Sequence, residues 1–282
     1  MPVSLLPIIG VIADAIYLTI AKAFLRRFGR FTSREFNWFM FASVILILAV
    51  LMPFIGELPV WSEIKKTAPW LLGAVVLACL HNTLFYWALE REKISEIEPF
   101  LLFNPLAGIM IAGIFYPSER FVQVYIAIVI ASIVLLWSHF RRHRVALSDG
   151  LLAILAFIIV SSFELVFLKQ LLAVYDPLSL YFVRCVFVLI GLTILVKPRL
   201  FILKSHHLRW FGAIGALVVV AVWATYSAFK LRGLSETLFV FTLSPILVYW
   251  FSAMFLKEKW QIKNIVASAA IVGLVIWITL LK

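Results

Sequence analysis

Ten long runs of apolar residues, separated by short polar segments, take up nearly the whole chain. Each run is continuous and has the length of about 20 residues that an α-helix needs to cross a bilayer. Strands of a membrane β-barrel would instead show alternating runs of about ten residues. Because backbone groups in lipid must bond within their own segment, we predict an all-α integral membrane protein. Its ten transmembrane helices are expected at Leu5–Leu25, Phe36–Ile55, Ala68–Leu89, Glu96–Tyr116, Phe121–Phe140, Gly150–Leu172, Leu178–Val196, Leu208–Phe229, Ser235–Phe255 and Ile262–Leu281.

The polar and aromatic positions that mark these runs occur twice along the chain. At an offset of 140 residues the matched pairs include Trp70 with Trp210, Tyr86 with Tyr226, Ser95 with Ser235 and Pro105 with Pro245. Earlier in the chain the offset is 147, where Lys22 matches Lys169 and Asn37 matches Arg184. Shared spacing of this kind indicates an internal duplication.

The duplication predicts two five-helix repeats, residues 1–145 and residues 146–282. Five is an odd number, so the second repeat must cross the membrane in the opposite sense to the first. This arrangement is an inverted-topology repeat with a pseudo-two-fold axis in the membrane plane.

Composition supports the membrane assignment, because 64% of the residues are hydrophobic and only 14% are charged. Soluble domains have about a quarter charged residues. The formal net charge is +11, but the Lys and Arg residues lie in short loops between apolar runs. We therefore expect contact with lipid headgroups instead of nucleic acid, and a multi-pass location in the plasma (inner) membrane. Cys79 and Cys185 lie inside apolar runs and are interpreted as small buried residues.

Charge on the two sides of the predicted helices differs. Sixteen of the 25 Lys and Arg residues lie on the side of the loops that follow the odd-numbered helices, and seven lie on the opposite side. The richer side is expected to be cytoplasmic, which would place both termini outside.

Three ionisable residues lie inside predicted helices, where charge is costly and marks a functional site by default. They are Asp14, Glu164 and Arg184. Measured along their helices, all three fall at roughly 9–14 Å from the side poor in Lys and Arg, so they share one layer near the bilayer midplane. Glu164 and Arg184 are candidates for a structural ion pair. Asp14 is a candidate for binding and releasing a proton.

Further candidates for substrate contact or proton transfer lie on the third and eighth predicted helices. His81 and Asn82 are adjacent on the third helix, and we favour a hydrogen-bonded packing role for His81 over a ligand role. Tyr86, Trp223 and Tyr226 are amphipathic aromatic residues that a pocket for an organic substrate would use, although aromatic residues in a chain with 25 Phe more often face lipid or the core.

Two prolines at matched positions are expected to bend their helices. Pro105 and Pro245 each lie about ten residues into a predicted helix. Proline removes a backbone donor and kinks a helix. Matched kinks in both repeats predict bends beside a central cavity.

Several ordered features resemble a known family. They are Tyr86-Trp87-Ala88-Leu89 followed by Ile94-Ser95, Asn104-Pro105 leading to Glu119, Ser244-Pro245 leading to Glu258, and the set Lys169, Asp176-Pro177 and Arg184. On these features the chain resembles, over essentially its whole length, the ten-span EamA-type transporters of the drug/metabolite transporter superfamily. Asn37 in place of a second Arg and the basic loop after the first helix depart from that pattern. Members of the family resemble an arrangement with both termini inside, whereas the charge count places both termini outside. The orientation therefore stays open.

The resemblance implies a secondary transporter for a small polar or amphipathic metabolite, such as an amino acid, with protons as a candidate coupling ion. Multidrug or organic-cation export is the alternative, and lipid scrambling is a third possibility. No GxSxG, HExxH, P-loop or GxGxxG motif occurs, so we predict neither enzymatic activity nor a cofactor nor a metal site. The expected partners are the substrate and membrane lipids, with the protein as monomer or homodimer.

Overall fold

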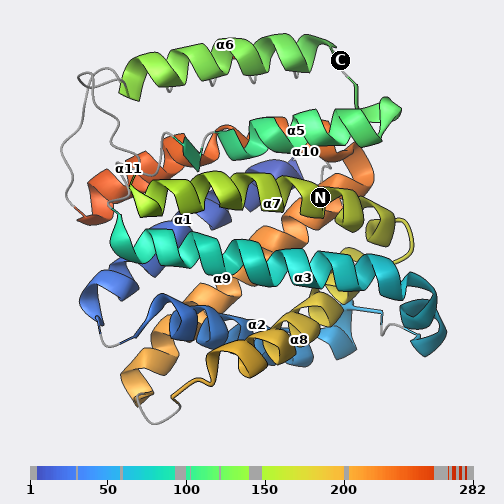
Figure 1. The fold of residues 1–282 in the computed structure, drawn as a ribbon, viewed down its shortest axis with the longest axis vertical. Helices are drawn as coiled ribbons and strands as arrows, with labels where there is room; N and C mark the ends of the chain where they lie inside the picture. Colours follow the sequence, from blue (N-terminus) through green and yellow to red (C-terminus); the bar gives the residue numbers. More distant parts are fainter. Residues whose placement is uncertain are drawn as a thin grey trace.

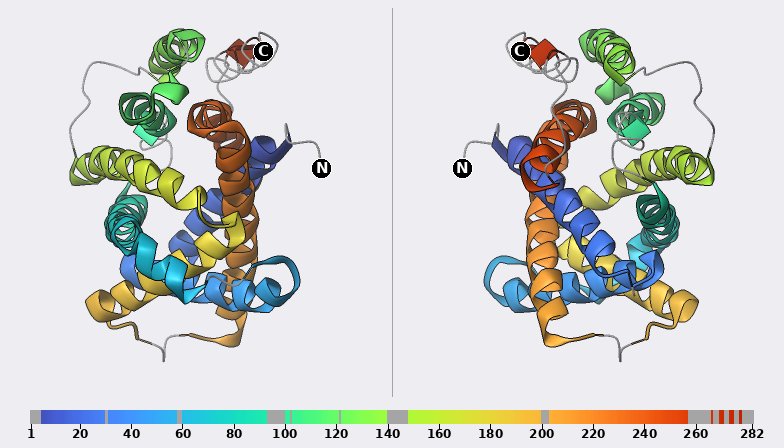
Figure 2. Two further views of the ribbon diagram at one scale, coloured as in Figure 1. Left: turned by 90° about the vertical axis from the view of Figure 1, so that its right-hand side faces the viewer. Right: turned by 90° about the vertical axis from the view of Figure 1, so that its left-hand side faces the viewer.

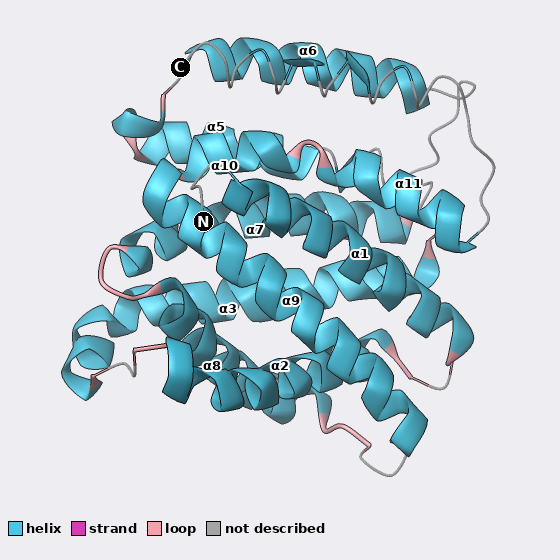
Figure 3. Ribbon diagram, turned by 180° about the vertical axis from the view of Figure 1, so that it is seen from behind, coloured by secondary structure: helices cyan, strands magenta, loops and turns pink. Residues whose placement is uncertain are grey.

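The computed structural model describes residues 5–29, 31–57, 60–92, 100–101, 103–120, 122–139, 148–199, 203–256, 266, 269–270, 273–274 and 277. Every regular element in this part of the chain is helical (Figure 3). The elements are α1 (Leu6–Arg27), α2 (Ser33–Ile55), α3 (Trp61–Arg91), α5 (Phe103–Phe115), the short 3-10 helix η2 (Pro117–Glu119), α6 (Val122–His139), α7 (Asp149–Leu172), α8 (Pro177–Val196), α9 (Ser205–Arg232), α10 (Leu234–Phe241) and α11 (Ser244–Leu256).

Six of the described helices are long and apolar enough to cross a membrane: α1, α2, α3, α7, α8 and α9. Three further apolar helices are shorter, and they fall where the fourth, fifth and ninth spans are predicted. The tenth predicted span lies almost wholly outside the described residues. The all-α membrane fold is therefore confirmed, and the count of ten spans stays a prediction.

Capping residues explain where several helices begin. Thr32 caps α2, because its hydroxyl accepts the Glu35 backbone N–H at 3.3 Å while the Glu35 carboxylate accepts the Thr32 N–H at 3.0 Å. Such reciprocal bonds satisfy backbone donors that a helix start leaves open. Asp176 caps α8 in a similar way, accepting the Leu178 N–H at 2.9 Å, with Pro177 as the first helical residue. Both starts lie within a few residues of the predicted ones.

Helices from the two halves of the chain pack against each other instead of forming separate bundles. Helix α3 lies along α7, α1 lies along α9, and α2 crosses α8 (Figure 1). The side views show α1, α9 and α11 on one side of the molecule and α3 and α7 on the other, with α2 and α8 joining them at one end (Figure 2). Helix α5 contacts α10 between these two sides.

The ninth predicted span is not one helix. Thr242 and Leu243 separate α10 from α11, and Pro245 is the second residue of α11. Proline suits the first turn of a helix, where its missing N–H would have no partner. The predicted kink at Pro245 is therefore corrected to a break just before it. Pro105 is the third residue of α5 and is buried.

Candidate functional site

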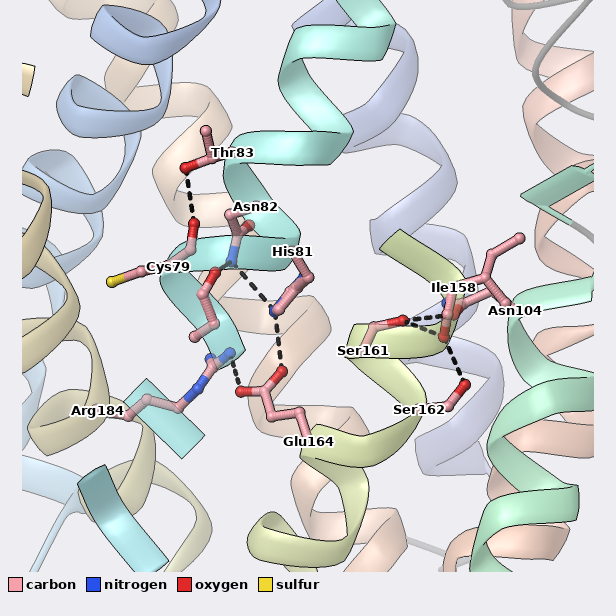
Figure 4. Close-up of polar contacts among 11 residues, drawn as sticks. Cys79, His81, Asn82, Thr83, Asn104, Ile158, Ser161, Ser162, Glu164 and Arg184 are labelled. Carbon is pink, nitrogen blue, oxygen red and sulfur yellow. Dashed lines mark hydrogen bonds and ion pairs between the residues drawn. The ribbon is translucent and has the colours of Figure 1, made fainter. Parts of the chain in front are cut away.

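A buried ionic cluster joins three helices in the middle of the molecule. The Glu164 carboxylate on α7 forms an ion pair with the Arg184 guanidinium on α8 and lies 2.8 Å from His81 Nε2 on α3 (Figure 4). Glu164 is 4% exposed and Arg184 is 6% exposed. The predicted Glu164–Arg184 pair is therefore present in the structure. The bond to His81 was not predicted, because nothing in the spacing of the sequence shows that α3 packs on α7.

Hydrogen bonding fixes the roles of the atoms around His81. The Asn82 amide nitrogen donates to the Ala78 carbonyl at 2.9 Å and lies 3.3 Å from His81 Nε2. A ring nitrogen either carries a proton or offers one lone pair. The shorter contact, to a carboxylate, assigns the Nε2 proton to the bond with Glu164. In the neutral ring, His81 Nδ1 is then a free acceptor.

Buried side-chain atoms on three residues have neither a hydrogen bond nor an ion pair among the described residues. They are His81 Nδ1, Arg184 Nε and both amide atoms of Asn37. Asn37, on α2, is 1% exposed, and it occupies the position that matches Arg184 in the repeat. A buried polar group without a partner costs roughly 1–3 kcal/mol. These groups are therefore strong candidates for contact with a bound molecule, and Asn37 is one that sequence reasoning had noted only as a match for Arg184.

Asp14 lies apart from the ionic cluster. Its carboxylate accepts a hydrogen bond of 3.1 Å from the Ser244 hydroxyl at the start of α11. Within the described residues no cation lies within ion-pair distance of Asp14, so the structure does not join it to Arg184.

A second hydrogen bond, Ser161 to Asn104 at 2.7 Å, links α7 to α5. In the repeat, Ser161 matches Asp14 at an offset of 147 and Asn104 matches Ser244 at an offset of 140. The two bonds thus join equivalent positions of the two halves.

The aromatic candidates take different positions. Tyr86 is buried, and its hydroxyl is hydrogen-bonded to that of Tyr17 on α1. Tyr226 is also buried, with its ring 5.9 Å from that of Tyr181 in an edge-on arrangement. Trp223 remains 36% exposed, and in the described part of the chain it makes no polar contact with the cluster. The two tyrosines, rather than the tryptophan, are positioned within the interior.

A second polar anchor lies at the ends of α7 and α9. The buried Glu119 carboxylate accepts a hydrogen bond from the Lys169 ammonium. It also accepts hydrogen bonds from the backbone N–H groups of Leu234 and Ser235, at 3.1 and 2.8 Å. Gly233 is the N-cap of α10, and Ser235 is its second residue. Burial raises the pKa of Glu119, but bonds from Lys169 and the two N–H groups outweigh burial and lower its pKa below 4.5.

Metal-ligating residues do not gather in the described part of the chain, where no group of three His, Cys, Asp or Glu side chains has suitable geometry. Cys79 and Cys185 are free thiols.

Comparison with known families finds a match for the second half of the chain. Residues 148–280 match the EamA-like transporter family. The match begins at Ser148, which caps α7, and lies inside the predicted second repeat. Together with the long apolar helices, this match indicates a multi-pass membrane protein.

A solved structure, described only as the crystal structure of a protein, shares the fold. It has a TM-score of 0.76 with this chain at 18% sequence identity, and the alignment covers 99% of this chain and 97% of that one. No curated protein matches the chain.

Proposed function

We propose that the protein is a secondary active transporter in which two inverted five-helix halves alternately open a central site to each side of the membrane. The helix contacts support this arrangement, since α1–α9 and α3–α7 are equivalent pairs under the repeat, as are α1–α11 and α7–α5. The matched hydrogen bonds Asp14–Ser244 and Ser161–Asn104 support it at the level of side chains. Inverted repeats bind substrates near the midplane, where the halves meet.

The observation that carries the proposal is the buried Glu164–Arg184–His81 cluster, in which His81 Nδ1 and Arg184 Nε have neither a hydrogen bond nor an ion pair among the described residues. A structural ion pair is stable when its remaining donors and acceptors are bonded. Here Arg184 Nε is an available donor and His81 Nδ1 an available acceptor. A zwitterion such as an amino acid supplies both complements, with its carboxylate toward Arg184 and its ammonium toward His81 and Glu164. The substrate is therefore a small zwitterionic metabolite.

A thermal-shift screen of purified protein in detergent tests the substrate class. The panel holds amino acids, sugar phosphates, nucleotides, polyamines and aromatic cations. A ligand present at about one hundred times its dissociation constant adds about 2.7 kcal/mol of stability. We expect a hit among amino acids that Arg184→Gln abolishes and the exposed control Arg199→Gln retains. Hits confined to aromatic cations would contradict the zwitterion proposal.

Proton coupling is the finer part of the proposal, with Asp14 and Glu164 as candidate carriers. Among the described residues Asp14 has one side-chain hydrogen bond, from Ser244, and no cationic partner, so its charge is easier to neutralise than that of Glu164. Transport into liposomes, measured with and without a pH gradient, should lose its gradient dependence in Asp14→Asn and keep it in the matched variant Ser161→Ala. Unchanged gradient dependence in Asp14→Asn would exclude Asp14 as the carrier.

Export of organic cations is the second candidate, favoured by the buried Tyr86 and Tyr226 and by the two interior carboxylates. It predicts binding of lipophilic aromatic cations that is lost in Glu164→Gln or Asp14→Asn. Arg184 opposes this function, because a positive charge beside the site repels a cationic ligand.

A further inference from the structure

A cavity at the ends of α7 and α9, away from the ionic cluster, combines two cations with apolar walls. Its volume is 210 Å³, and it is lined by Lys169, Leu172, Ala173, Phe229, Lys230 and Leu234. Ligand pockets commonly measure about 300–1,000 Å³. This cavity is therefore suited to the head of an amphipathic molecule or a small anion instead of a large metabolite.

The two ammonium groups retain donors for a ligand. Lys230 Nζ donates to the Tyr175 carbonyl at 2.9 Å, and Lys169 is bonded to Glu119. An ammonium has three donors, so each Lys has N–H groups beyond these bonds. In the described part of the chain no carboxylate lies within ion-pair distance of Lys230. Its charge is thus uncompensated at the wall of the cavity.

The equivalent place in the first half is built differently. Lys22, which matches Lys169, bonds to the carbonyls of Leu89 and Glu92 at the end of α3. Glu90 stands where the second half has Lys230, and its carboxylate accepts the Ser33 N–H at 3.2 Å. In the second half the corresponding position near the end of α9 is Lys230. This second cation of the cavity is therefore particular to the second half.

The wall residues and the position of the cavity indicate the chemical class of its ligand. Leu172, Phe229 and Leu234 are buried apolar residues, and α7 and α9 are helices of membrane-spanning length. Their ends belong at the boundary between lipid and water, where anionic headgroups gather. We propose that this cavity binds an amphipathic anion, with a phosphate or carboxylate head between Lys169 and Lys230 and an apolar chain against Leu172, Phe229 and Leu234. The proposal is independent of the transported substrate.

Binding to purified protein in a neutral detergent tests the proposal without any transport assay. The probes are dioctanoyl phosphatidylglycerol, octyl phosphate, inorganic phosphate and, as a neutral lipid, dioctanoyl phosphatidylcholine. Each is titrated while the midpoint of thermal unfolding is recorded. We expect phosphatidylglycerol, octyl phosphate or both to raise the midpoint, and the neutral lipid to leave it unchanged. Phosphatidylglycerol alone would identify a membrane lipid as the ligand, and octyl phosphate alone a soluble anion.

Lys230→Gln removes one cation and leaves the Lys169–Glu119 anchor intact. Loss of one charge-assisted hydrogen bond should weaken binding about tenfold, and Lys230→Arg should retain it. Lys66→Gln is the matched control, because it removes the same charge from an exposed Lys that does not line the cavity. Lys66 is next to Thr67, whose hydroxyl lies 2.7 Å from that of Tyr175, the residue that Lys230 contacts. Equal affinity in wild type and Lys230→Gln would overturn the proposal. So would the absence of any anion effect, or an effect of inorganic phosphate equal to that of octyl phosphate.

Discussion

Helices α1 and α7 occupy equivalent places in the proposed repeat, yet their acidic residues stand at different positions. Asp14 of α1 matches Ser161, while Glu164 of α7 matches Tyr17. When the two helices are aligned at the offset of 147 residues, the two acids are three positions apart, which is almost one helical turn. The comparison teaches that the halves share a framework of contacts without sharing its charges.

The surroundings of these positions differ in the same way. Tyr17 bonds to Tyr86 in a neutral contact, whereas Glu164 joins His81 and Arg184 in an ionic one. Asn37, in the position that matches Arg184, is neutral and has no hydrogen-bond partner among the described residues. In the proposed inverted repeat the two halves would give equivalent geometry on both sides of a site. Their unequal charges would give that site the polarity that the proposed zwitterionic substrate requires.

The largest effect should come from breaking the ionic cluster. Arg184→Met leaves the buried Glu164 carboxylate with His81 as its hydrogen-bond partner and without its ion-pair partner, and should cost about 3–5 kcal/mol of unfolding free energy. The matched change Asn37→Ala should cost far less, because the Asn37 amide has no hydrogen bond to any described residue. Denaturant unfolding in detergent measures both. The double variant Arg184→Met/Glu164→Gln should recover much of the stability, and failure to recover would mean that Arg184 acts through packing instead of charge.

The next effect concerns the anchor at Glu119. Glu119→Gln removes the charge that holds Lys169 and the start of α10 and should cost about 1.5–3 kcal/mol at pH 7. Because the folded state lowers the pKa of Glu119, its stabilisation is complete well above the ordinary value of 4.5 and disappears as the pH falls through the lowered folded value.

Unfolding midpoints at several pH values between 7 and 3 check this sign. The difference between wild type and Glu119→Gln should shrink as the solution becomes more acidic. A difference that stays constant across this range would show that the carboxylate charge does not stabilise the fold.

The matched hydrogen bonds allow a finer comparison. Ser161→Ala removes a bond to a neutral amide and should cost about 1 kcal/mol, whereas Ser244→Ala removes a bond to a carboxylate and should cost about twice as much at pH 8. Both variants are compared by unfolding in the same detergent. Equal costs would show that Asp14 is protonated at that pH, which would also bear on its role as a proton carrier.

The smallest effect on stability should follow Asn37→Leu. Replacing a buried amide that has no partner by an apolar side chain of similar size should leave the unfolding free energy unchanged or raise it by about 1 kcal/mol. Binding of the amino-acid hit should nevertheless weaken, if Asn37 contacts the substrate as proposed. Retained affinity, measured by the same thermal shift, would remove Asn37 from the site.

Several features of the fold could be predicted because they depend on local rules. Helices α2, α7 and α8 begin and end close to the predicted residues, since run length and capping residues such as Thr32 and Asp176 fix helix ends. The Glu164–Arg184 pair could also be predicted, because both residues lie in one layer and a buried charge needs a partner. The break before Pro245 could not, because a proline near a helix start and a proline inside a helix look alike in an unbroken apolar run.

Other contacts could not be read from spacing. The bonds of Glu164 to His81 and of Lys169 to Glu119 join residues 83 and 50 positions apart. The helices are all apolar and similar in composition. The pattern of hydrophobic residues therefore does not identify which helices pack against each other. For the His81–Glu164 bond, the sequence showed only that a His lies in one predicted helix and an acid in another. His81 could have paired with any of several polar residues in the other helices.

The sequence by itself determined the membrane character, the helical class, the position of most spans and the duplicated order of landmark residues. These follow from hydropathy, from the need to satisfy the backbone in lipid and from capping chemistry, all of which act over a single segment. Only the tertiary structure decided that α3 lies on α7, that His81 completes the cluster of Glu164 and Arg184, and that Lys230 borders an open cationic cavity. Those outcomes depend on side-chain packing between helices far apart in the chain, and packing is fixed only when all the helices are placed together.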